Sequence, residues 1–120
     1  MREVYEDMKT LLKDIISNNG ATLTKAGDKV CLSKGWQVSK RDLLIIPVYK
    51  LRKYLIKDML SSIDDGDCLG IWIDNKKVYI DLSVTIPTKK QAIKIGKQNK
   101  QLSIWGWKNS EVVWLNKKKA

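Results

Sequence analysis

The chain has 120 residues, 43% of them hydrophobic, and 23 Lys and Arg against 13 Asp and Glu give a formal net charge of +10. This size predicts a single domain, residues 1–120, with a basic tail at 116–120, and no apolar run is long enough to span a membrane. Histidine is absent, and no phosphate-binding glycine loop or nucleophile elbow occurs, so we expect no enzyme, no catalytic residue, no metal site and no cofactor.

The N-terminal third begins with a predicted helix. Apolar residues in 2–18 fall on one helical stripe, and Asn19-Gly20 supplies the stop. The same segment is charged and has no small-residue cleavage site, so we expect no signal peptide. Residues 21–39 alternate β-favouring stretches with glycine turns and predict loops and short strands. The run "DLLIIPV" (42–48) predicts a strand or an extended entry into a helix.

The middle of the chain predicts a second helix and a first hairpin. Apolar residues from Val48 to Ile63 recur at helical spacing, and "DDGD" (64–67) reads as a turn. In "CLGIWIDNKKVYIDLS" (68–83) the natural turn centre is Asn75-Lys76, which pairs Trp72 with Tyr79.

The C-terminal third predicts a third helix and a second hairpin. Pro87 and Thr88 open a helix over residues 89–99. A turn centred on Asn109-Ser110 then closes a hairpin over 102–115 and pairs Trp105 with Trp114. The predicted class is α+β, with an antiparallel sheet built from two hairpins and about three helices.

Alternation along the strands sorts the side chains of each hairpin onto an aliphatic face and an aromatic face. We expect the amphipathic helices to cover the aliphatic face. The aromatic face has two interpretations: rings buried as core, or rings left accessible for stacking on bases or for docking a partner. The residues of this stacking or partner face are Trp72, Tyr79, Trp105, Trp107 and Trp114.

Lysines form two further candidate surfaces. Residues 21–57 carry a net charge of +7 and residues 82–120 a net charge of +8, around an acidic block at 58–81. The lysines on these surfaces have two interpretations: they are simply solvated, or they contact phosphate or an acidic partner. Lysine contacts phosphate as a point charge, so nucleic-acid binding would have little sequence specificity. One helical face each is predicted for Lys50, Lys53 and Lys57 in the second helix, and for Lys90, Lys94 and Lys97 in the third.

The cysteines and the acidic residues carry weaker signals. Cys31 and Cys68 match no metal spacing and predict buried thiols in a reducing, cytosolic compartment. An alternative hypothesis is a small nuclease that holds Mg²⁺ through carboxylates, although the "DDGD" turn has the simpler interpretation of a hydrophilic loop. The carboxylates concerned are Asp64, Asp65, Asp67, Asp74 and Asp81.

Five short motifs form a further pattern: "GAT" at 20–22, "GWQV" at 35–38, "LGIW" at 69–72, "VYIDLS" at 78–83, and Asn99, Gln101 and Ile104 after the third helix. With these motifs the chain resembles a family of short, uncharacterised proteins carried by bacteriophages and other mobile elements. The likeness covers most of residues 18–107 and brings no established activity with it. The chain is more basic than the family, and Gly106-Trp107-Lys108 replaces its usual aspartate. The resemblance implies a phage-type accessory protein in the cytoplasm of a bacterial host.

These observations predict a non-enzymatic binding protein that engages nucleic acid or a host nucleoprotein. An inhibitor of a bacterial defence system, of the anti-CRISPR kind, is one concrete version. A basic protein of this kind would not mimic DNA, because mimicry needs an acidic surface. A homodimer that uses the tryptophan face is a further alternative. We expect no membrane partner.

Overall fold

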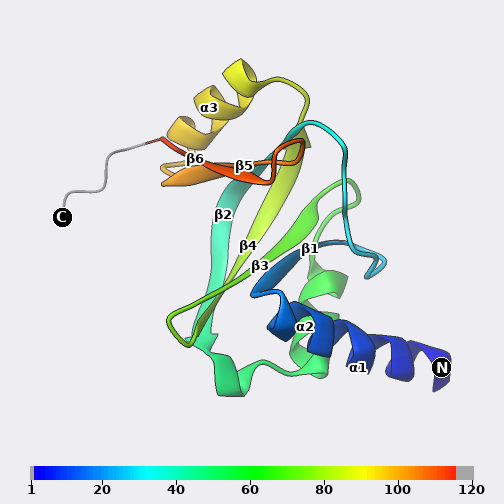
Figure 1. Ribbon diagram of the computed structural model, residues 1–120. Coiled ribbons are helices and arrows are strands. Elements are labelled where there is room, and N and C mark those ends of the chain that lie inside the picture. The colour runs from blue at the N-terminus through cyan, green and yellow to red at the C-terminus, as the bar shows by residue number, and fades with distance from the viewer. Residues whose placement is uncertain (1, 116–120) are drawn as a thin grey trace.

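The computed structural model describes residues 2–115, with side chains from residue 9 onward, so the basic tail at 116–120 lies outside the described residues. Within this range the chain forms three α-helices, one short 3-10 turn and a six-stranded sheet (Figure 1). In chain order the elements are α1 (Arg2–Ser17), β1 (Gly20–Thr24), β2 (Trp36–Pro47), η1 (Val48–Lys50), α2 (Lys53–Ser62), β3 (Cys68–Asp74), β4 (Lys77–Ile86), α3 (Lys89–Gln98), β5 (Ser103–Gly106) and β6 (Glu111–Trp114).

The sheet is antiparallel and has the strand order β1-β3-β4-β2-β5-β6. The long strand β2 joins the two hairpins: it pairs with β4 over most of its length and with β5 only through Trp36 and Gln37. Two bulges in β2, at Lys40 and Leu43, interrupt its alternation. Because so few residues join β2 to β5, the β5–β6 ribbon leaves β2 at a steep angle, as Figure 1 shows.

All three helices lie on one side of the sheet, with α1 and α2 at one end of it and α3 at the other. Helices α1 and α2 cover a core that includes Leu69, Ile71 and Ile80, while α3 covers a second, smaller core around Val38 and Ile104. Strand β4 contributes its even-numbered side chains to both cores, and residues two apart on a strand point to the same face. The expectation that helices cover the aliphatic face is therefore confirmed.

The predicted class, α+β with an antiparallel sheet and three helices, is confirmed. The first hairpin has the predicted register, with Trp72 opposite Tyr79, and its turn residues Asn75 and Lys76 both have positive φ (49° and 64°). Helix α3 begins as expected, because the Gln91 amide donates to the Thr88 hydroxyl at 3.3 Å.

Two predicted details are wrong. The second hairpin is shifted by two residues, so that Trp105 pairs with Val112 and Trp114 with Ser103, because the turn spans residues 107–110. A shift of two residues leaves every side chain on its predicted face. The second helix does not begin at Val48: Pro47 leads into η1, and α2 starts at Lys53.

Candidate functional site

The face of the sheet opposite the helices carries the predicted rings, and no described helix covers it. We call this surface the helix-free face. The register places on it side chains from β3, β4 and β2 at one end and from β5 and β6 at the other. Its principal members are Gln37, Asp42, Ile45, Trp72, Tyr79, Asp81, Ser83, Thr85, Trp105, Trp107, Val112 and Trp114.

One end of this face has an apolar row, which we call the hairpin patch: the exposed Ile45 and Trp72 and the partly buried Tyr79. The three residues are direct cross-strand neighbours, since Trp72 pairs with Tyr79 and Tyr79 pairs with Ile45. The exposed fraction is 51% for Trp72 and 55% for Ile45. Large apolar side chains on three adjacent strands form a continuous accessible platform, which the helix side of the sheet lacks.

Gly20 keeps the platform open on its outer side. It is the β1 partner of Trp72, and it has no side chain to lie against the ring. Its φ is +147°, and a Cβ there would stand 2.4 Å from the carbonyl oxygen of Ile71. Glycine is therefore required beside Trp72 by the backbone itself.

The other end of the face has a second group of rings, the ribbon patch: Trp105, Trp107, Val112 and Trp114. Trp105 and Trp107 meet edge to face with their ring centres 6.2 Å apart. Trp114 is 66% exposed, and the other two indoles are partly buried. The interpretation of the rings as fully covered core is thus wrong for Trp72 and Trp114, and Trp107 lies in the turn rather than in a strand.

Gln37 holds the ring of Trp107 in place through a hydrogen bond. Its amide Nε2 donates to the Ser83 hydroxyl at 2.8 Å, and its Oε1 accepts from the Thr85 hydroxyl at 2.8 Å. The same Oε1 accepts from the indole Nε1 of Trp107 at 3.1 Å. Gln37 and Ser83 are both buried, so this network joins β2, β4 and the β5–β6 turn in a protected setting.

We expect Gln37→Leu to lower the free energy of unfolding by about 2 kcal/mol, because it leaves buried donors and acceptors unsatisfied. Urea unfolding followed by circular dichroism measures this difference. Trp107 should also lose its fixed position, seen as a change in the near-ultraviolet signal of the folded protein. The matched control is Gln98→Leu at an exposed position on α3, which should change stability by less than about 0.5 kcal/mol. Equal stability of the two variants would contradict this role of Gln37.

Two carboxylates face each other between the patches. Asp42 and Asp81 are cross-strand partners, and the Asp81 carboxylate lies over Gly70, where a Cβ would stand 2.4 Å from its Oδ1. Burial, followed by repulsion from Asp42, raises the pKa of Asp81 to about 6. The centre of the helix-free face is therefore unfavourable for a phosphate group above that pH.

The predicted lysine sets lie on the helix side of the sheet, away from the rings. Lys53 and Lys57 share one face of α2, but Lys50 belongs to η1, so the expectation of a three-lysine row on one helix is wrong there. The other set is complete: Lys90, Lys94 and Lys97 are all exposed on α3, which contains no acidic residue. We call these three the α3 lysine row. They form no ion pair with any residue between 9 and 115.

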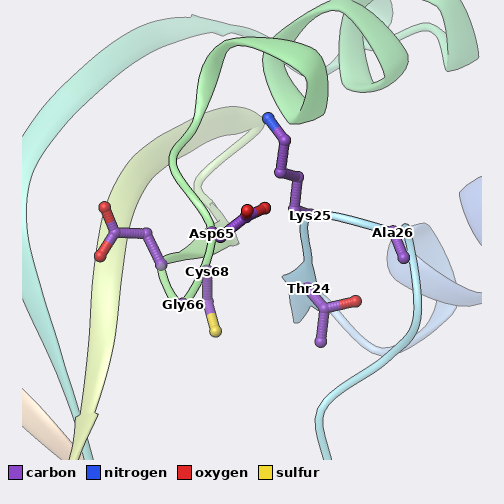
Figure 2. Close-up of a pocket in the computed structure, with 7 residues that line it drawn as sticks. Thr24, Lys25, Ala26, Asp65, Gly66 and Cys68 are labelled. Carbon is purple, nitrogen blue, oxygen red and sulfur yellow. The ribbon is translucent and has the colours of Figure 1, made fainter.

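The turn at 64–67 lines a shallow depression of about 410 Å³ beside β1 (Figure 2). Two of its charged residues, Lys25 and Asp67, have partners in the structure. Lys25 points toward the end of α2, where its ammonium donates to the Ser61 carbonyl at 3.2 Å, and Asp67 receives Lys40 at 3.2 Å. Across residues 9–115, no group of three or more His, Cys, Asp or Glu side chains could hold a metal ion.

Both cysteines are free thiols, in different surroundings. Cys68 is buried beside the depression, and burial raises the pKa of its thiol. Cys31 is exposed in the loop before β2, so the prediction of a buried thiol is wrong for this residue. The polar and apolar residues of that loop follow no helical or strand periodicity, so the sequence does not predict which of its side chains are buried.

No family model, no curated protein and no solved structure matches this chain. None of the helices within residues 2–115 is long and apolar enough to cross a membrane.

Proposed function

We propose that this is a non-enzymatic binding protein whose helix-free face stacks the bases of single-stranded nucleic acid. The observation that carries the proposal is the hairpin patch, a continuous apolar row on an antiparallel sheet in which Trp72 and Ile45 are exposed and Tyr79 is partly buried between them. Exposed rings of this kind are unfavourable in water unless a partner covers them, and every nucleotide base offers a flat face to stack on.

The charge distribution supports bases, rather than phosphates, as the groups that contact this face. Lys77 and Lys108 lie at its two ends, whereas Asp42 and Asp81 occupy its centre. The net charge of +10 attracts a polyanion over a distance, and the acidic centre keeps phosphates outside while bases meet the rings. A duplex hides its bases within the stack, so the face is suited to single strands.

A titration of fluorescein-labelled dT15 at 50 mM and 200 mM salt, followed by anisotropy, tests the proposal. We expect saturable binding, stronger than for a 15-base-pair duplex once the salt concentration is 200 mM. A parallel titration with U15 distinguishes DNA from RNA as the preferred strand. Absence of binding to either strand at 50 mM salt would overturn the proposal. Concentration-dependent sedimentation without ligand would then favour a homodimer through the ring face.

The wider role that we propose follows the family resemblance. A phage-type protein that holds single-stranded nucleic acid in the cytoplasm of a bacterial host can engage a host nucleoprotein that exposes such a strand. Inhibition of a defence system of the anti-CRISPR kind is one such role. Co-purification from a bacterial host, with protein and nucleic acid both identified, is the direct test.

A further inference from the structure

The α3 lysine row and the rings of the ribbon patch lie on opposite sides of the same two strands. Gly96 of α3 packs so closely that a Cβ there would stand 2.4 Å from Leu115 and 3.1 Å from Ile104. Because side chains alternate along a strand, Trp105 and Trp114 point away from this contact. Figure 1 shows α3 directly over the β5–β6 ribbon.

The outer face of α3 is a strongly cationic surface without internal compensation. Four of its ten residues are lysines and none is acidic. Lys89 and Lys90 even occupy the first turn, where the helix dipole favours negative side chains. Such a charge arrangement does not serve the stability of the helix, and it is complementary to a row of phosphates.

We infer that the α3 lysine row is a second nucleic-acid surface, which contacts the phosphates of a duplex while the helix-free face holds a single strand. This inference rests on the proposed function. From Lys90 to Lys97 the helix advances by about 10 Å, a length over which duplex DNA carries about six phosphate charges. Lysine reads no base edges in this geometry, so the duplex contact is independent of sequence.

Two surfaces on opposite sides make the protein a bridge between two nucleic-acid segments. A strand stacked on the rings does not occupy the lysines, because α3 and the sheet separate the two sites. The two contacts also differ in physical character. Phosphate contacts release counterions and depend steeply on salt, whereas stacking does not.

Energy transfer between donor-labelled dT15 and an acceptor-labelled 20-base-pair duplex measures bridging at 100 mM salt. We expect transfer only when the protein is present. The variant Lys94→Glu/Lys97→Glu should abolish it, and should lower the log–log salt slope of duplex binding by about 2, at about 0.9 for each lost contact. Affinity for dT15 at 200 mM salt should change by less than about threefold.

The matched control is Lys9→Glu/Lys13→Glu, which makes the same charge change at exposed positions of α1. This control should preserve energy transfer. If the wild-type protein binds dT15 but produces no transfer, or if both double variants lose duplex binding equally, the inference is overturned while the proposed function stands. If the wild-type protein binds no single strand at all, the proposed function itself fails.

Discussion

The double variant Trp72→Ala/Tyr79→Ala should bind dT15 at least about 30-fold more weakly than the wild-type protein. Each stacked base contributes roughly 1–3 kcal/mol, and 1.4 kcal/mol corresponds to a factor of ten in affinity. Trp72→Ala alone should cost about tenfold. Because neither ring carries a charge, the log–log salt slope should stay unchanged, as measured by anisotropy at several salt concentrations.

Tyr54→Ala is the control for this experiment. Tyr54 is also an exposed ring, 54% accessible, but it lies on α2 at the helix side of the sheet. Its removal should leave dT15 affinity within about twofold of the wild-type value. Urea unfolding of all the variants checks that the sheet remains intact, which the half-exposed position of Trp72 leads us to expect. Equal losses at Trp72 and Tyr54 would contradict a role for the hairpin patch.

Asp81→Asn should raise the free energy of unfolding by about 1–3 kcal/mol at pH 7.5. The pKa of Asp81 is raised from 3.8 to about 6, first by burial and then by Asp42, so the folded state binds its proton more tightly than the unfolded state does. This group therefore favours folding most below about pH 4, and its contribution is lost as the pH rises to about 6. The shift from 3.8 to about 6 is about two pKa units, and one unit corresponds to about 1.4 kcal/mol. The upper end of the expected range is therefore about 3 kcal/mol.

The difference between wild type and Asp81→Asn should consequently grow from near zero at pH 4 to a plateau above pH 6.5. Thermal and urea unfolding at several pH values measure it. Asp42→Asn should produce a smaller gain, because it removes only the repulsion and leaves the burial of Asp81. Asp65→Asn, at an exposed turn position, is the control for the loss of one carboxylate. A constant offset for Asp81→Asn across this range would contradict the proposed origin of the effect.

Local sequence signals predicted much of this fold. The amphipathic stripe predicted α1, Pro87 and Thr88 predicted the start of α3, and Asn75-Lys76 predicted the register of the first hairpin. The sorting of rings from aliphatic side chains also follows from alternation alone. These features depend on contacts between residues close in the sequence.

The remaining features depend on contacts that the sequence does not display locally. The two bulges of β2 break its alternation at Lys40 and Leu43, so only the last half of this 12-residue strand was predicted as one extended run. The strand order places β2 between β4 and β5, a pairing across long segments of chain. The position of the α3 lysine row on the side of the sheet opposite the rings depends on that strand order and on the packing of α3 against β2 and β5.

The indole N–H signals in a proton–nitrogen correlation spectrum test the central claim, that the helix-free face binds single strands, most directly. Trp36 is an internal reference, because it packs on the helix side beneath α3, with Lys89 over its ring at 5.5 Å. On titration with dT15, the signals of Trp72 and Trp114 should shift in a saturable manner while that of Trp36 stays in place. Shifts of Trp36 alone, or saturable binding without any change at Trp72, would contradict the account.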